Sequence, residues 1–249
     1  NQTATGDGQR MAEAVGGRIL NGDLALGPEI RFIAPAQENF VRRLPPWRWL
    51  AVAMEWSLEH LPQAILRPFM MKFLTTALAP STTLFEQGAI LVNARGERFG
   101  SELDRPAWRL PDQSGKVGYI VIDGALAKQF SSWPNYISTA PGIAYAYIPD
   151  YRQNRPDVYV EASTLKELAA RLGMDEASLA ASAAQGPVRA LGAGPYVALG
   201  PVRSVFVHSE GGLMVDLEHR VLGRDGQPIA GLYAAGSTGQ GGLLPKGHG

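Results

Sequence analysis

Residues 228–242 read PIAGLYAAGSTGQGG, a short apolar run that ends in a cluster of glycines. Leu232 to Ala235 predict a short buried strand, and six glycines lie between Gly236 and Gly249. Because glycine has no Cβ, such backbone can bend tightly or approach another group closely. The stretch therefore predicts a strand that ends beside a ligand, and the alternative is an ordinary glycine-rich turn.

The opening of the chain has the pattern of a capped helix. Apolar residues from Met11 to Val15 recur at helical spacing after the sequence TGDG at residues 5–8, and Gly16-Gly17 follow them. Asp7 is the N-cap residue that this pattern predicts.

The middle of the chain mixes helical and strand patterns. Between Trp47 and Leu78, apolar residues recur every three or four positions, which predicts two or three short amphipathic helices broken at Pro62 and Pro68. Their Trp, Met and Phe side chains predict deep packing; a role at a substrate entrance is the less favoured alternative. Residues 89–93 and 119–123 predict strands, and the first of them returns through a turn at residues 95–99.

The second half contains explicit helix and turn signals. Thr164 and Glu167 form a capping box ahead of a helix that ends at Gly173, and a second helix is predicted over residues 175–184. Asp225-Gly226 predicts a hairpin turn.

The composition indicates a small-molecule partner. The 23 basic and 23 acidic side chains cancel, so the chain lacks the positive field that binding of nucleic acid or anionic membranes needs. The absence of cysteine excludes disulfides and thiolate catalysis, and the four histidines show no spacing typical of metal ligands. No apolar run approaches the roughly 18 residues of a transmembrane helix. Any redox chemistry must therefore come from a bound cofactor.

Four segments form an ordered set along the chain. They are ATGDG at residues 4–8, GAILVN with GERF at 88–93 and 96–99, TLKELA at 164–169, and VHSEGG with PIAGLYAAG at 207–212 and 228–236. Together they resemble the flavoprotein family of fumarate reductases and succinate dehydrogenases, which also contains 3-ketosteroid dehydrogenases. Each motif is weak alone, but their order and spacing match throughout the chain.

This resemblance implies an α+β fold and FAD as cofactor. A capping, substrate-binding domain is expected over residues 39–185, flanked by parts of an FAD-binding α/β domain at 1–38 and 186–249. The Gly-x-Gly-x-x-Gly motif that would bind the pyrophosphate is absent, and in the family it precedes the segment seen here. We therefore expect an interior piece of a longer protein, with a further segment missing near Gln185-Gly186.

The resemblance also implies catalytic residues. His208 matches a position that holds a substrate carboxylate or carbonyl, and an imidazole can donate to such an oxygen at neutral pH. The family's proton-donating arginine aligns with Pro106, and a gap of one residue brings it to Arg105. A packed or surface histidine and a surface arginine are the alternatives.

The substrate-binding positions depart from the family. Ser81 and Thr82 align with a threonine and a glutamate that contact a dicarboxylate, so the acid is lost. The family's second arginine falls near residues 245–248, where only Lys246 or His248 could replace it, and lysine lacks the bidentate fork of arginine. These differences argue against a true fumarate reductase.

The positions that contact the cofactor match the family more closely than the substrate-binding positions do. Asp7, Ser209, Gly236 and Ser237 match residues that contact the flavin, and Gly211 and Gly212 allow the backbone to approach its ring. Ser237 replaces the usual glutamate but can still bond a ribityl hydroxyl. For Asp7, helix capping alone is the alternative.

The expected function follows from this set of residues. The intact protein should be an FAD-dependent dehydrogenase or reductase that acts at a carbon–carbon bond next to a carboxylate or carbonyl, while the fragment alone should bind FAD weakly or not at all. The alternative is a binding or structural module that keeps the capping fold without redox activity. An electron-transfer partner and the compartment stay open, with the cytoplasm favoured.

Overall fold

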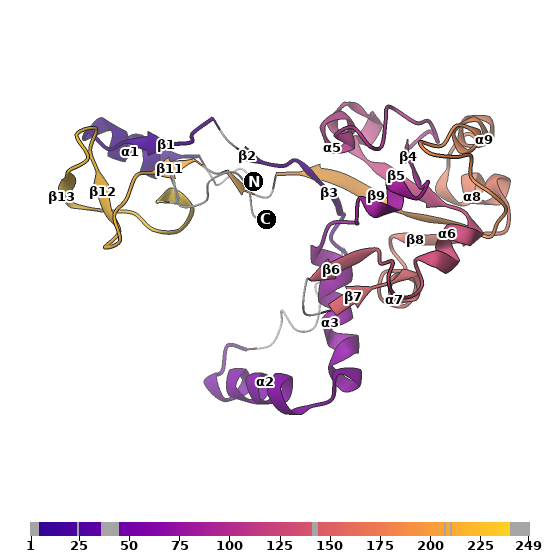
Figure 1. Cartoon of the computed structure of the whole chain (residues 1–249), viewed down its shortest axis with the longest axis horizontal. Coiled ribbons are helices and arrows are strands. Elements are labelled where there is room, and N and C mark those ends of the chain that lie inside the picture. The colour runs from indigo at the N-terminus through magenta and orange to yellow at the C-terminus, as the bar shows by residue number, and fades with distance from the viewer. Residues whose placement is uncertain are drawn as a thin grey trace. The chain divides into compact units, whose positions relative to one another are not determined.

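The computed structural model describes residues 5–23, 25–35, 45–140, 144–206, 208–209 and 211–239 (Figure 1). They form a mixture of helices and sheets, which confirms the α+β class. Two compact units are present: unit 1 combines Asn1–Glu29 with Val205–Gly249, and unit 2 is Ile30–Ser204. Within the described residues, no helix is long and apolar enough to cross a membrane.

A five-stranded sheet organises unit 2. Its strands follow the order β3 (Glu29–Phe32), β9 (Tyr196–Val205), β5 (Gly118–Ile122) and β4 (Ile90–Asn93), and β8 (Tyr159–Ala162) also pairs with β9. The predicted strands at 89–93 and 119–123 are thereby found. Because β9 pairs antiparallel with both β5 and β8, it belongs to the compact unit that extends to Ser204.

The two faces of this sheet pack into separate hydrophobic clusters. Leu91, Ile120 and Ile122 belong to one cluster, whereas Ile90 and Val92 belong to the other. Successive side chains of a strand point to opposite faces, so burial of both faces explains why all four residues of β4 are buried.

Helices cover both faces of the sheet (Figure 1). The second cluster packs against α8 (Leu165–Leu172) and α9 (Glu176–Ala184). The larger cluster receives residues from α3 (Gln63–Ala77), α4 (Thr83–Glu86), α5 (Pro106–Arg109), α6 (Gly124–Gln129) and α7 (Ile148–Asn154). Unit 2 also contains the 3-10 turns η2 (Leu110–Asp112) and η3 (Ser114–Lys116) and the hairpin of β6 (Ser138–Ala140) with β7 (Ala144–Ala146).

The predicted cap of α8 at Thr164 and the predicted helix α9 are confirmed. The Thr164 hydroxyl accepts a hydrogen bond from the Glu167 amide at 3.1 Å, and Gly173 ends α8 with a left-handed φ of 68°. The Asp175 carboxylate caps α9 by accepting from the Ser178 amide at 2.8 Å.

The predictions for residues 47–78 were partly wrong. Pro62 does separate α2 (Arg48–His60) from α3, but α3 continues through Pro68. The backbone bond lost at Pro68 is offset by tertiary packing, since Met71 and Leu74 of the same helix are each only 2% exposed. Deep packing of α2 is also wrong, because Trp49 and Trp56 are 63% and 55% exposed.

Unit 1 is built from both ends of the chain. It comprises α1 (Asp7–Ala14), β1 (Ile19–Leu20), β2 (Ala25–Leu26), β10 (His208–Ser209), β11 (Gly212–Leu213), β12 (Arg220–Leu222), β13 (Pro228–Tyr233) and the 3-10 turn η4 (Gly236–Thr238). β1 pairs with β11 and β2 with β10, both antiparallel. Its core is small: Ala12, Leu213, Val221 and Ala234 are its fully buried members.

The hairpin at Asp225-Gly226 is confirmed, since β12 pairs antiparallel with β13 and Gly226 has a φ of 77°. The prediction that the run after this hairpin, Leu232 to Ala235, forms a buried strand is wrong for most of its residues. Tyr233 is 64% exposed, and Ala234 is the residue of that run that enters the core.

Candidate functional site

The opening helix and the glycine-rich tail lie together in unit 1. A Cβ placed on Gly8 in the first turn of α1 would lie 3.6 Å from the Thr238 Cγ2 atom of η4. Both α1 and η4 also contact β11. The two segments matched to flavin-contacting positions are therefore neighbours, although they stand more than two hundred positions apart in the chain.

Gly236 and Ser237 occupy an open edge of this arrangement. Gly236 has a left-handed φ of 60°, and nothing lies within 4 Å of where its Cβ would stand. Both residues are exposed. The backbone conformation therefore favours glycine at residue 236, and no atom of another described residue, its chain neighbours aside, lies within 4 Å of the position of its Cβ.

The predicted capping role of Asp7 is wrong. Gly6, with a φ of 73°, is the N-cap, and Asp7 is the first helical residue. Its carboxylate instead accepts a hydrogen bond from the Thr5 hydroxyl at 2.6 Å and pairs with Arg10. The Thr5 bond and the Arg10 charge lower the pKa of Asp7, so it is a carboxylate at neutral pH.

His208 and Ser209 lie on the strand that pairs with the first part of the chain. In register, His208 stands opposite Leu26 and Ser209 opposite Ala25. Gly211 approaches protein backbone closely, because a Cβ there would lie 2.6 Å from the Gly22 Cα. Gly212 is buried in β11 opposite Leu20. The structure thus supplies a packing reason for Gly211 that the sequence did not reveal.

Ser81 and Thr82 lie at the start of α4 in unit 2. The Ser81 amide donates to the Ile137 carbonyl at 2.7 Å, and its hydroxyl accepts from the Thr83 amide at 3.3 Å. Ser81 is half-buried and Thr82 is exposed. Leu84 and Phe85 next to them are buried in the large cluster of unit 2, which fixes this turn.

Arg105 is the N-cap of α5 and has an unusual backbone conformation. Its φ of 47° and ψ of 53° are left-handed, although it is not glycine and precedes Pro106. Such a conformation costs about 1–3 kcal/mol and persists only where surrounding contacts impose it. Ala107 and Leu110 supply such contacts by entering the same hydrophobic cluster as Leu84 and Phe85. Arg105 itself is exposed.

A buried ion pair precedes Arg105. Glu102, whose side chain is 1% exposed, accepts from Arg98 Nε at 2.7 Å and Arg98 Nη2 at 2.5 Å, and from the Leu91 amide at 3.1 Å. Hydrogen bonding to Glu102 raises the pKa of Arg98. The spacing of four positions between these two opposite charges is the signal in the sequence that points to the pair.

The predicted site residues fall into two groups. Asp7, His208, Ser209, Gly211, Gly212, Gly236 and Ser237 are all in unit 1, and Ser81, Thr82 and Arg105 are in unit 2. Lys246 and His248 lie outside the described residues. In the part of the chain that is described, no group of three or more His, Asp or Glu side chains has the arrangement of a metal site.

A model of the FAD binding domain family matches residues 53–245, which is more than half of the chain. The chain belongs to this family. FAD is the family's cofactor, and the predicted resemblance is confirmed.

Curated relatives with matching sequence are oxidoreductases. The chain is 31% identical over 157 residues to "Fumarate reductase (cytochrome)" of Shewanella frigidimarina, covering 61% of this chain and 27% of the relative. It is 27% identical over 194 residues to "4-oxocyclohexanecarboxylate 2-dehydrogenase" of Sinomonas cyclohexanicum, covering 61% and 31%. The chain thus spans about a third or less of these relatives.

Two solved structures share the fold. The open conformation of a flavocytochrome c3 fumarate reductase matches with a TM-score of 0.59 and 23% identity, over 97% of this chain and 36% of that one. The 3-ketosteroid delta1-dehydrogenase of Sterolibacterium denitrificans matches with a TM-score of 0.51 and 18% identity, over 96% and 42%. At these identities the likeness shows the fold alone.

Proposed function

We propose that this chain is part of an FAD-dependent dehydrogenase or reductase that acts at a carbon–carbon bond next to a carboxylate or carbonyl. The observation that carries the proposal is the match to the FAD binding domain family over residues 53–245. The packing of the opening helix against the glycine-rich tail in unit 1 supports it, because both were expected to contact the flavin.

Four residues of unit 1 fit the cofactor. Gly236 and Ser237 present an exposed backbone and hydroxyl beside open space, which suits a flavin ring and its ribityl chain. Asp7 presents a carboxylate at the start of α1, and Ser209 lies on β10. When bound, FAD would supply the two-electron hydride exchange, and the residues of this chain would position it.

The substrate would be held by hydrogen bonds and charges from this chain. Ser81 and Thr82 offer hydroxyls, and His208 offers an imidazole that can donate to a carboxylate or carbonyl oxygen. Lys246 or His248 would replace the family's second arginine. A substrate with one acidic group suits this set better than a dicarboxylate, because the glutamate and the bidentate arginine are absent.

Arg105 would deliver the proton. In a reduction, one carbon of the double bond gains a hydride and its neighbour gains a proton, so a donor must stand near the second carbon. The strained left-handed backbone of Arg105 is the observation that favours it, since such outliers concentrate at functional positions.

The compounds in the names of the relatives support a substrate with a carboxylate or a carbonyl group. Fumarate is an unsaturated carboxylate, and 4-oxocyclohexanecarboxylate carries both a ketone and a carboxylate. Each offers a carbon–carbon bond beside a polarised carbonyl group. The direction of the reaction and the electron partner are left open in this proposal.

The absorbance of the intact protein tests this proposal against its alternative. A yellow protein whose reduced flavin is reoxidised by an unsaturated carboxylate or ketone supports the enzyme, and Arg105→Gln should then lower turnover by 10²-fold or more while leaving the flavin bound. A colourless intact protein would instead support a module that keeps the capping fold without redox activity.

A further inference from the structure

We propose that the buried Arg98–Glu102 ion pair is a positioning device for Arg105. The inference rests on the proposed function, since it concerns how the proton donor is held. Glu102 is not free to meet a substrate, because its side chain is 1% exposed and both of its oxygens are bonded within the protein. Arg98 is also engaged, since its Nε and Nη2 donate to Glu102 and its Nη1 donates to the Gln185 carbonyl. The pair acts through the backbone that follows it.

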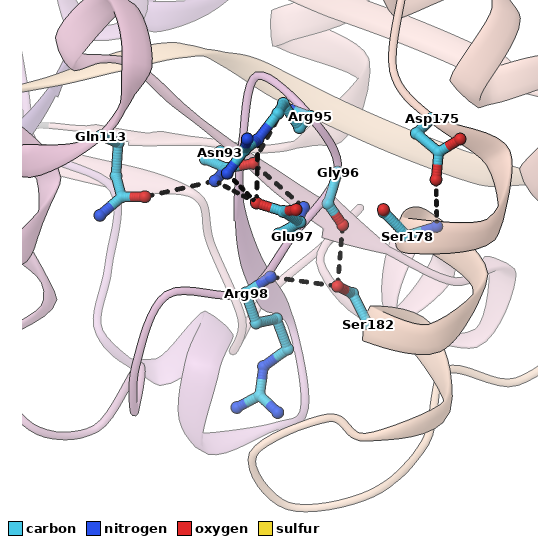
Figure 2. A network of polar contacts seen from close by, with 9 residues as sticks. All are labelled: Asn93, Arg95, Gly96, Glu97, Arg98, Gln113, Asp175, Ser178 and Ser182. Carbon is cyan, nitrogen blue, oxygen red and sulfur yellow. Dashed lines mark hydrogen bonds and ion pairs between the residues drawn. The ribbon is translucent and has the colours of Figure 1, made fainter.

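The arginine end of the pair is fixed by its neighbours. The Arg98 amide donates to the Ser182 hydroxyl at 3.1 Å, and that hydroxyl donates to the Gly96 carbonyl at 2.8 Å (Figure 2). Ser182 lies on α9, so this contact ties Arg98 to the helix that covers the sheet. Glycine is required at residue 96, where φ is 86° and a Cβ would lie 3.1 Å from Leu179.

The turn before Arg98 is held just as firmly. The Asn93 side chain accepts from the amides of Arg95 and Glu97 at 2.9 and 3.1 Å, and donates to Gln113 at 3.2 Å (Figure 2). Asn93 itself is only 4% exposed at the end of β4. Arg98 therefore projects from a rigid loop whose position is set by the sheet and by α9.

The glutamate end fixes the segment that leads to Arg105. Glu102 joins this segment to the sheet by accepting from the Leu91 amide of β4. Three residues later the chain adopts the left-handed conformation of Arg105, and the Trp108 amide then donates to the Arg105 carbonyl at 3.0 Å. Asp104, which lies within this segment, pairs with Arg109 of α5 at 2.9 Å. This pair attaches the segment to α5 as well as to the sheet.

This arrangement explains how a strained arginine is maintained on the surface. Arg105 is exposed, so packing of its own side chain is not what imposes its backbone conformation. The constraint must come from the attachments on either side, which are Glu102 on the sheet and the buried Ala107 and Leu110. Without the carboxylate of Glu102, the segment can relax toward the favoured right-handed or extended region.

The test compares two buried carboxylates of the same unit. Glu102→Gln removes the charge of the proposed device, and Asp123→Asn removes that of the Asp123–Arg189 pair, whose carboxylate is as buried as that of Glu102 but bonds a different loop. In the intact flavoprotein, both changes should lower the melting temperature. Only Glu102→Gln should lower kcat, by 10-fold or more, with a smaller change in KM and no loss of bound flavin.

A double substitution separates positioning from a general structural effect. If Glu102 acts through Arg105, Glu102→Gln should cause no further loss of kcat in an Arg105→Gln background, because the group it positions is already gone. The inference would be overturned if the double variant lost kcat by the product of the two single losses. It would also be overturned if Asp123→Asn lowered kcat as much as Glu102→Gln does. Arg98→Lys keeps the charge but loses the bidentate geometry, so it should fall between wild type and Glu102→Gln.

Hydrogen exchange tests the positioning role of the ion pair without any measurement of turnover. The backbone amides of residues 103–105, 107 and 108 should exchange at least several-fold faster in Glu102→Gln and at the wild-type rate in Asp123→Asn. Unchanged exchange in Glu102→Gln would refute the positioning role even where activity is lost. If the wild-type protein binds FAD but turns over no enoate or ketone, the proposed function fails, and the exchange result still decides whether the pair holds Arg105.

Discussion

At the scale of single residues, the carboxylate of Asp123 is held inside the protein by three hydrogen bonds. Its side chain is fully buried and accepts from Arg189 at 2.6 Å, from the Gly192 amide at 2.7 Å and from the Leu126 amide at 2.9 Å. It therefore caps α6 and also fixes the loop that precedes β9. Burial disfavours its charged form, but the bond to Arg189 and the two amide bonds prevail, so the pKa of Asp123 is lowered.

This depressed pKa predicts a contribution to stability that depends on pH. A carboxylate with a lower pKa in the folded state stabilises the protein above its unfolded pKa of about 3.9, and the contribution disappears as pH falls through the folded value. Urea denaturation between pH 7 and pH 2.5 should show a smaller loss of stability in Asp123→Asn than in wild type. Identical pH profiles would contradict the assignment.

Replacing the buried Arg155 is expected to cause a larger loss of stability than replacing Asp123. This arginine is 2% exposed, donates to the backbone carbonyls of Thr75 at 2.8 Å and of Ile33, and pairs with Asp157 at 2.8 Å. Replacing it with Met would leave two carbonyls and a carboxylate without their donor, so we expect a loss of about 3–5 kcal/mol in the free energy of unfolding. Arg95→Met, at a mostly exposed ion pair, is the control and should cost under about 1 kcal/mol.

At the scale of secondary-structure elements, α2 is the main departure from expectation. Its tryptophans occur at helical spacing, yet Trp49, Trp56 and Val52 between them are all more than half exposed. Trp56 stacks on His60, with ring centroids 4.8 Å apart, and not on the core. Helical periodicity identifies an apolar face but does not say what covers it.

The exposure of α2 predicts tolerance to polar substitution. Trp49→Gln and Trp56→Gln should each change the free energy of unfolding of this chain by about 0.5 kcal/mol or less, because little apolar area leaves a packed environment. Leu84→Ala, at a fully buried position of the large cluster, should cost about 2–5 kcal/mol in the same denaturation assay. Comparable losses at the two tryptophans would show that the helix is packed after all.

Capping at α8 offers a second test at this scale. Thr164→Ala removes the acceptor of the Glu167 amide and should cost about 1 kcal/mol, whereas Thr164→Ser should keep most of the stability. Equal losses in both variants would mean that the methyl group, and not the hydroxyl bond, is what matters.

At the scale of the whole molecule, the notable feature is that unit 1 joins the two ends of the chain. The contact between Gly8 and Thr238 can be tested by crosslinking, since the chain contains no cysteine of its own. Gly8→Cys together with Thr238→Cys should form an intramolecular disulfide on mild oxidation, because a Cβ on residue 8 would lie 3.6 Å from the Thr238 Cγ2 atom, which brings two thiols at these positions within reach of each other. Faster gel migration and loss of both free thiols would report it.

Each single cysteine variant serves as a control and should remain a free thiol in the monomer. A double variant that stays reduced, or that crosslinks only between molecules, would show that α1 and η4 do not meet. That outcome would also remove the support that unit 1 lends to the flavin-binding proposal.

The sequence by itself determined the features that depend on neighbouring residues. The strand patterns at residues 90–93 and 118–122, the cap at Thr164, the helix from residue 175 onward and the turn at Asp225-Gly226 can all be read from residues a few positions apart, and they were predicted. The ordered motifs also predicted the FAD-binding family, which the family match confirms. The roles of His208, Arg105 and the other site residues remain predictions.

Only the tertiary structure decided which distant segments share an environment. It assigned β9 to the sheet of unit 2, left α2 exposed, let α3 continue through Pro68, and revealed the strained backbone of Arg105 beyond a buried Glu102. The physical reason is that burial and backbone strain are set by contacts between residues far apart in the chain. Periodicity and capping signals record only the preferences of residues that are close together in sequence.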